Sequence, residues 1–159
     1  MKKQLIYLSI LLTLSTLSQI SIAQDESGKR QKNYNLSSGQ LAIQGYDPVG
    51  YFVSNQAVKG KKELQYTYKG IKYYFANQSN LNTFKQNPDK YEPAYGGWCA
   101  YAVGAKNDKV SIDPGTFKIK NGKLFLFYNS WGTNTLNYWN QDESALYKKA
   151  EVNWKKLYQ

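Results

Sequence analysis

Apolar and polar residues alternate in two neighbouring stretches of the chain, residues 64–69 and 71–76. Aromatic residues recur at every second position of both, which is the period of a strand with one buried face. One strand would present Tyr66 and Tyr68, and the other Tyr73 and Phe75. We therefore predict an antiparallel hairpin that turns around Lys69-Gly70.

A second hairpin is predicted where Asn121-Gly122 separates residues 116–120 from residues 123–129. Asn-Gly favours a two-residue turn because both residues tolerate a positive φ. In the second strand, Leu and Phe side chains occupy both faces. We expect this strand to be covered on both sides.

A period of three to four residues predicts helices in two places. Asn77 is a favoured N-cap for a short helix that turns Leu81 and Phe84 inward and ends before Pro88. Residues 88–93 then read as extended or turn-like. The tail, residues 131–157, is predicted to be helical, with one apolar face formed by Leu146, Ala150 and Trp154. The fold class is α+β: a small antiparallel sheet built from hairpins, covered by short helices, with a helical C-terminal tail.

Residues 95–103 are the segment around which we expect the rest to pack. They hold the only cysteine of the chain, Cys99, among six consecutive apolar or aromatic residues that follow two glycines. A helix with apolar residues all round would be buried. A buried strand is the alternative, but the alanines favour a helix.

The N-terminus has the pattern of a secretory signal peptide over residues 1–23. Two lysines precede an apolar run, and Ser21-Ile22-Ala23 supplies the small residues that a signal peptidase recognises. The run is too short and too rich in Ser and Thr for a stable membrane span. We expect cleavage after Ala23 and a periplasmic or extracellular protein, with a flexible lead-in over residues 24–40 and a single domain over residues 41–157.

Composition adds two features to this picture. The formal net charge is +10, which favours anionic partners such as surface polymers, although a solvated lysine face also explains it. Nucleic acid is not an expected partner outside the cytoplasm. The 15 Tyr, 6 Phe and 4 Trp residues belong mainly to the core, and exposed ones could stack on sugars or anchor a protein partner.

Several motifs in register resemble a YHS domain. They are Asp47-Pro48-Val49, Tyr68 to Phe75, Phe84, and Asn87 to Tyr91. The chain is most similar to the secreted bacterial branch of that family, whose further motifs stand here at residues 45–52, 95–103, 113–117, 122–129 and 150–154. The resemblance implies the fold of the family and no settled activity.

The metal chemistry of that family does not carry over to these residues. Metal-handling YHS domains have cysteines after the Asp-Pro-Val motif and around the start of the short helix. The corresponding positions here are Gly50, Ala76 and Asn80, and none of these residues ligates a soft metal.

The residue types that the chain lacks exclude further kinds of metal and catalytic site. The chain has no histidine, which excludes imidazole metal sites and Ser-His or Cys-His pairs, and its one methionine is Met1. One thiolate does not make a closed metal site, and the aspartates lack calcium-loop spacing. We therefore predict no cofactor and no metal, and find no catalytic signature.

Cys99 itself has two interpretations. It is a small buried hydrophobe, or it lies in the first turn of a helix, where free N–H groups stabilise a reactive thiolate. The apolar neighbours favour the first interpretation.

Two functional hypotheses follow. The preferred one is a non-catalytic module of the cell envelope that binds a small molecule or an envelope protein. Its expected binding residues are Tyr46, Asp47, Tyr51, Gly96, Gly97, Trp98, Cys99 and Tyr101. The alternative is a thiol-dependent redox protein or a protein that handles copper or another soft metal, centred on Cys99.

Overall fold

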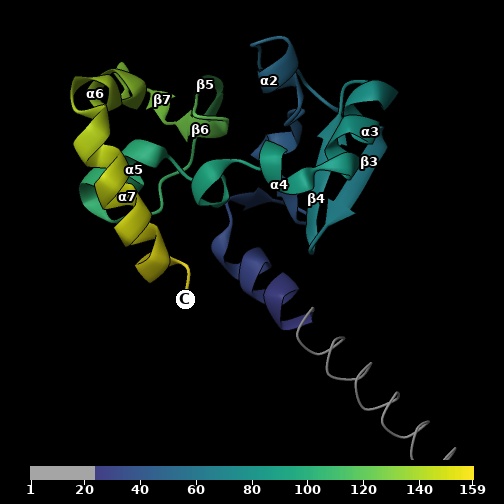
Figure 1. Cartoon of the computed structure of the whole chain (residues 1–159), viewed down its shortest axis with the longest axis horizontal. Helices are drawn as coiled ribbons and strands as arrows, with labels where there is room; N and C mark the ends of the chain where they lie inside the picture. The colour runs from purple at the N-terminus through teal and green to yellow at the C-terminus, as the bar shows by residue number, and fades with distance from the viewer. Residues whose placement is uncertain (1–23) are drawn as a thin grey trace, which may run out of the picture.

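The computed structural model describes residues 24–159 (Figure 1). The predicted signal peptide, residues 1–23, lies outside the described residues. The strands are β1 (Leu36–Ser37), β2 (Leu41–Ala42), β3 (Lys61–Tyr68), β4 (Ile71–Phe75), β5 (Asp113–Lys120), β6 (Lys123–Phe127), β7 (Asn129–Ser130) and β8 (Thr133–Asn134). The α-helices are α2 (Gly50–Val53), α3 (Gln78–Gln86), α4 (Pro88–Tyr91), α5 (Ala100–Lys106), α6 (Thr135–Gln141) and α7 (Glu143–Leu157), with short 3-10 helices η1 (Ile43–Gly45) and η2 (Ala94–Gly97). These elements confirm the α+β class.

The first sheet has the strand order β1-β2-β4-β3. β3 and β4 form the predicted antiparallel hairpin around Lys69-Gly70, whose φ angles are 46° and 80°. β2 runs parallel to β4, a pairing that no local sequence signal indicated. On one face of the hairpin, the ring of Phe84 lies between 4.9 and 6.3 Å from four strand rings, those of Tyr66, Tyr68, Tyr73 and Phe75.

Helix α3 confirms the prediction made from its cap. The Asn77 side chain accepts a hydrogen bond from the Asn80 N–H at 2.9 Å, and Leu81 and Phe84 are buried. The expectation for residues 88–93 was partly wrong, because α4 occupies their first four positions. Proline favours the first turn of a helix, where its missing N–H leaves no bond unmade.

Residues 24–33 form a helix, in contrast to the flexible lead-in predicted over residues 24–40. Arg30 and Asn33 in this helix are 3% exposed. The Arg30 guanidinium pairs with Glu92, and Glu92 also accepts a hydrogen bond of 2.5 Å from the Tyr73 hydroxyl. Polar and aromatic contacts hold this helix, so a search for apolar periodicity does not find it.

The central segment differs from the single buried helix that we expected. Tyr95, Gly96 and Gly97 adopt positive φ angles of 55°, 59° and 82° in η2, and helix α5 begins only at Ala100. Cys99 is the residue before the helix, and it forms a parallel bridge with Leu126 of β6. Most of the segment is buried as predicted, but it combines a 3-10 helix, a single β-bridge and the start of an α-helix.

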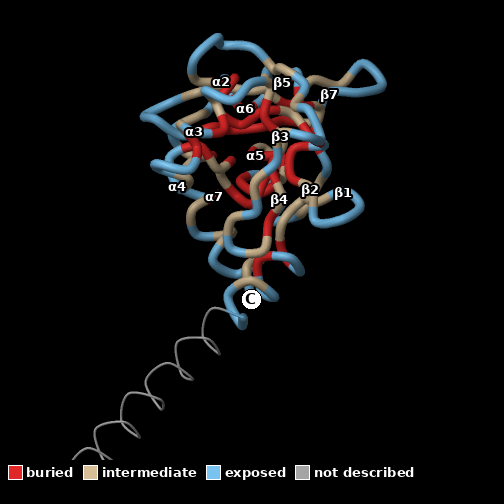
Figure 2. The backbone as a smooth tube through the Cα atoms, turned by 90° about the vertical axis from the view of Figure 1, so that its right-hand side faces the viewer, coloured by how far each residue is buried: buried red, intermediate tan, exposed pale blue. Residues whose placement is uncertain are grey.

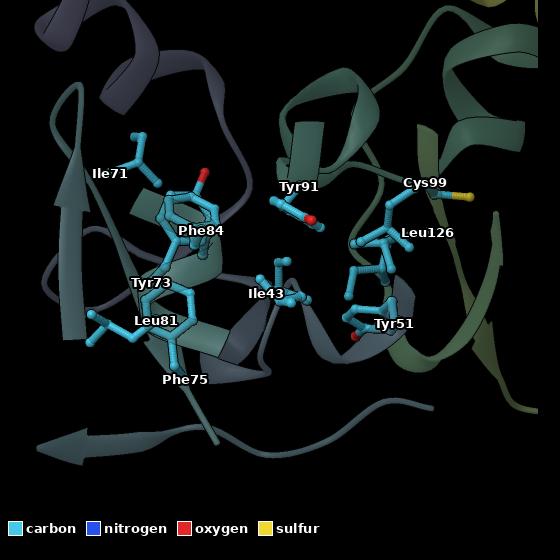
Figure 3. Close-up of a cluster of buried hydrophobic side chains, with 14 of the residues drawn as sticks. Ile43, Tyr51, Ile71, Tyr73, Phe75, Leu81, Phe84, Tyr91, Cys99 and Leu126 are labelled. Carbon is cyan, nitrogen blue, oxygen red and sulfur yellow. The ribbon is translucent and has the colours of Figure 1, made fainter. Parts of the chain in front are cut away.

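Strand β6 separates two hydrophobic clusters, which we call the first core and the second core. Leu124 and Leu126 face the first core, around Phe84, whereas Phe125 and Phe127 face the second core, around Trp139. Figure 3 shows side chains of the first core, and Figure 2 shows the buried backbone running through the middle of the molecule. The prediction that this strand is covered on both sides is confirmed.

The tail is helical as predicted from Thr135 on, in two pieces that break at Asp142. The prediction was wrong for residues 131–134, where a turn leads into β8. Leu146 and Ala150 are buried in the second core, and Trp154 packs against it. Figure 1 shows α5, α6 and α7 gathered beside the β5–β6 hairpin. Among residues 24–159, no helix combines the length and apolar character that a membrane crossing requires.

Candidate functional site

Among the predicted binding residues, Asp47 has the side chain with the most hydrogen bonds, and its carboxylate accepts four. It is fully buried and follows η1, where it begins the turn into α2. Oδ1 accepts the N–H groups of Val49 at 2.9 Å and Gly50 at 3.3 Å. Oδ2 accepts the backbone N–H of Ala76 at 2.8 Å and the Asn80 side chain at 2.7 Å. Asp47 thus ties α2 to the end of β4 and the start of α3.

The two predicted tyrosines near Asp47 also have structural partners. Tyr51 is 1% exposed and donates a hydrogen bond of 2.9 Å to the Pro114 carbonyl. Burial raises the pKa of Tyr51, which keeps its hydroxyl a donor. Tyr46 lies at the edge of the first core, with the Lys59 ammonium 4.5 Å from its ring centre.

Gly96, Gly97 and Trp98 bind the N-terminal segment of the same chain. The Gly96 carbonyl accepts the Asn35 N–H at 2.9 Å, and the Gly97 carbonyl accepts the Asn35 side chain at 3.0 Å. The Trp98 indole donates to the Asn33 carbonyl at 2.7 Å. A Cβ at Gly96 would lie 2.7 Å from the Tyr34 ring, so the chain approaches too closely here for any side chain.

The Cys99 thiol is fully buried. In Figure 3 its sulfur points away from the other labelled side chains of the first core. Sγ lies 3.3 Å from the Thr135 hydroxyl and accepts the Tyr128 N–H at 3.4 Å. Tyr101, two residues on, is partly buried and packs against both cores.

A cavity of about 270 Å³ lies elsewhere, between the β5–β6 hairpin and helices α6 and α7, and none of the eight predicted binding residues lines it. Its apolar wall consists of the rings of Phe125, Trp139 and Tyr147. Phe125 and Trp139 are buried, with ring centres 5.8 Å apart. Its polar lining consists of Lys120, Asn121, Lys123, Glu143, Ser144 and Lys148.

Glu143 organises one side of this cavity. Its carboxylate pairs with Lys118 at 2.9 Å and with Lys120, and it accepts the Trp139 indole N–H at 3.0 Å. Burial acts to raise the pKa of Glu143, but the hydrogen bonds from Lys120, Lys118 and Trp139 outweigh it and lower the pKa to about 2. Glu143 is therefore ionised at neutral pH, and both of its oxygens are engaged.

The remaining lysines of the cavity are less constrained. Lys123 donates to the Tyr147 hydroxyl at 3.2 Å, and its nearest carboxylate is that of Glu151, at 3.9 Å. The hydrogen bond with Tyr147 raises the pKa of Lys123, which stays charged. Lys148 forms no ion pair with any residue that the structure describes.

Sequence reasoning missed this cavity, although two signals were present. Lys120 and Lys123 flank the predicted Asn121-Gly122 turn, which places both lysines at one end of the hairpin. Trp139, Glu143 and Tyr147 follow at intervals of four residues, the spacing of one helical face. Only the fold brings these two sets together.

Comparison with known families identifies part of the chain. Residues 49–95 match the family model of the YHS domain, so the chain contains such a domain, as its motifs indicated. The matched segment runs from α2 to the middle of η2 and leaves the cavity outside it. Comparison with curated proteins and with solved structures found no significant match for the chain.

The residues of this YHS domain do not fit a soft metal. Gly50, Ala76 and Asn80, the positions where metal-handling relatives carry cysteines, converge in space, and each donates an N–H group to Asp47. The Asp47 carboxylate fills the place between them, and no thiol or imidazole faces it. Within residues 24–159, no three His, Cys, Asp or Glu side chains cluster closely enough to hold a metal ion.

Proposed function

We propose that this YHS-domain protein is a non-catalytic binding module of the cell envelope, and that it takes up a small ligand in the cavity between the β5–β6 hairpin and α7. The observation that carries the proposal is the composition of this cavity. An aromatic wall beside a few convergent polar groups is typical of small-molecule sites.

The state of the reactive side chains supports binding over catalysis. Asp47 already accepts four hydrogen bonds, and Glu92 is paired with Arg30 and Tyr73. A general acid or base must reach a substrate proton, and these carboxylates are committed to the fold. The chain also has no histidine to serve instead.

The envelope location rests on the sequence of residues 1–23, which has a basic start, an apolar run and small residues before position 24. The lysine excess of the chain suits an environment rich in anionic polymers. In this proposal the YHS domain and the N-terminal helix form the scaffold that supports the ligand-binding half.

The alternative centred on Cys99 gains no support from the geometry. A redox or copper-transfer thiol must meet its partner, whereas Cys99 is fully buried and bonded to Thr135 and Tyr128. We therefore place ligand binding in the cavity and give Cys99 a structural role.

Ser144 lines the cavity and provides the test. Ser144→Phe should fill the space, whereas Lys149→Phe, on an exposed position of the same helix that does not line the cavity, is the matched control. Ligand-observed NMR with a set of single-ring fragments should detect binders that lose binding in Ser144→Phe and keep it in Lys149→Phe. Circular dichroism verifies that both variants are folded. Fragments that bind equally to both variants would remove the cavity from the proposal.

A further inference from the structure

The aromatic wall of the cavity favours a flat apolar ligand. Phe125 packs against Trp139 on one side and against Tyr147 on the other, with ring centres 5.8 and 6.0 Å apart. Phe125 and Trp139 are buried in the second core, so only a small part of each ring borders the cavity, and the partly buried Tyr147 offers most of the aromatic surface. An accessible aromatic ring such as that of Tyr147 favours a ligand ring that can pack offset or edge-on against it.

The rim of the same cavity is cationic. Three lysines line it against one carboxylate, Glu143, whose oxygens are already engaged by Lys118, Lys120 and Trp139. A cationic ligand would find no carboxylate available in the lining. An anionic ligand would find Lys148, which is unpaired among the described residues, and Lys123, whose closest partner is the neutral Tyr147 hydroxyl.

The volume limits the size of the ligand. A cavity of about 150 Å³ holds one benzene molecule, so about 270 Å³ accommodates one or two fused rings with a short polar group. We propose that the cavity binds a small aromatic carboxylate, with its ring mainly against Tyr147, beside the accessible parts of Phe125 and Trp139, and its carboxylate at Lys123 and Lys148. This inference rests on the proposed function and narrows it to one class of ligand.

Three probes of related shape test the inference by titration calorimetry at neutral pH and low ionic strength. They are 2-naphthylacetate, 2-(2-naphthyl)ethylamine and acetate, which separate the contributions of the ring and of the charge. We expect 2-naphthylacetate to bind at least about tenfold more tightly than the amine, and acetate not to bind measurably.

Variants of single lysines test which lysines bind the carboxylate of the ligand. Lys148→Gln and Lys123→Gln should each weaken the binding of 2-naphthylacetate by about three- to tenfold, whereas the binding of the amine should not weaken and should strengthen as the repulsion falls. Lys149→Gln removes the same charge outside the cavity and should change neither, which controls for the overall positive charge. Melting temperatures of the three variants verify that each is folded.

The outcomes separate this inference from the proposed function. Equal affinity for the acid and the amine, or equal loss in Lys149→Gln and Lys148→Gln, overturns the assignment of an aromatic carboxylate and leaves the binding role standing. The assignment is also overturned if neither naphthyl compound binds measurably. The proposed function fails only if the fragments that test the Ser144→Phe variant do not bind the cavity either.

Discussion

At the scale of single residues, the structure shows the hydrogen-bond partners of the polar groups that the sequence singled out. Asp47 was expected to bind a ligand, yet its four hydrogen bonds all go to its own chain. Cys99 was expected to lie in an apolar helix, yet its sulfur has two polar neighbours. Both residues were chosen from motifs, but a motif does not say whether the groups around it are donors or solvent.

Replacing Asp47 should therefore destabilise the fold strongly. Asp47→Ala leaves three backbone N–H groups and the Asn80 amide without an acceptor in a buried place, and we expect a loss of about 3–5 kcal/mol in the free energy of unfolding. Urea denaturation measures the change. Asp108→Ala, at an exposed aspartate bonded only to the neighbouring Lys109 N–H, is the control and should stay within about 0.5 kcal/mol. Similar stability of the two variants would show that the Asp47 network does not hold the domain together.

Cys99 gives a second residue-scale prediction. Its complete burial should make a thiol reagent label the native protein at least about a hundredfold more slowly than the denatured protein. Cys99→Ser can keep bonds to Thr135 and Tyr128, whereas Cys99→Ala leaves the Tyr128 N–H unpaired. We expect the serine variant to be the more stable one, by about 1 kcal/mol. Fast native labelling, with both variants stable, would instead restore the hypothesis of a reactive thiol.

At the scale of secondary-structure elements, the locally encoded features were predictable. Asn121-Gly122 and the Asn77 cap act through their own backbone, so the sequence located the second hairpin and α3 closely. The parallel pairing of β2 with β4 and the helix over residues 24–33 depend on contacts distant in sequence, such as Arg30 with Glu92. The cavity was missed for the same reason, since its lining combines a hairpin with two helices.

The hairpin turn supports a prediction at this scale. Asn121 and Gly122 have φ angles of 51° and 73°, and a Cβ at Gly122 would meet no atom within 4 Å. Gly122→Val should therefore act through backbone strain alone and lower the free energy of unfolding by about 1–3 kcal/mol. Gly115→Val in β5, where φ is not positive and the nearest contact is 3.5 Å, is the matched control. Equal melting temperatures for the two variants would contradict the strain argument.

At the scale of the whole molecule, the N-terminal helix joins both cores. On one side, Arg30 pairs with Glu92 and its guanidinium lies 5.5 Å from the Tyr68 ring centre. On the other side, Tyr34, the residue that directly follows the helix, lies 6.4 Å from Trp154 and 6.2 Å from Tyr158, both near the C-terminus. The matched YHS segment ends at Tyr95, so this helix connects the YHS domain to the part of the chain that carries the cavity.

We expect the Arg30–Glu92 pair to contribute most to the packing of this helix against the rest of the protein. The two side chains are 4% and 10% exposed, and burial raises the pKa of Glu92 even though Arg30 and the Tyr73 hydroxyl oppose the rise. Removing one partner of a buried pair leaves an uncompensated charge, so Arg30→Met and Glu92→Met should each lower the free energy of unfolding by about 3–5 kcal/mol. The double variant leaves no buried charge and should lose less than the sum of the two.

Amide hydrogen exchange tests whether the Arg30–Glu92 pair stabilises the N-terminal helix in particular. In Arg30→Met, the amides of residues 24–33 should exchange faster by a larger factor than those of β4, because the helix undocks before the sheet opens. Lys69→Ala removes the exposed pairs with Glu26 and Asp89 and should change stability by less than about 1 kcal/mol, which makes it the control for a surface charge. If Arg30→Met behaved like Lys69→Ala, the aromatic contacts of Tyr34 with Trp154 and Tyr158 would have to hold the helix instead.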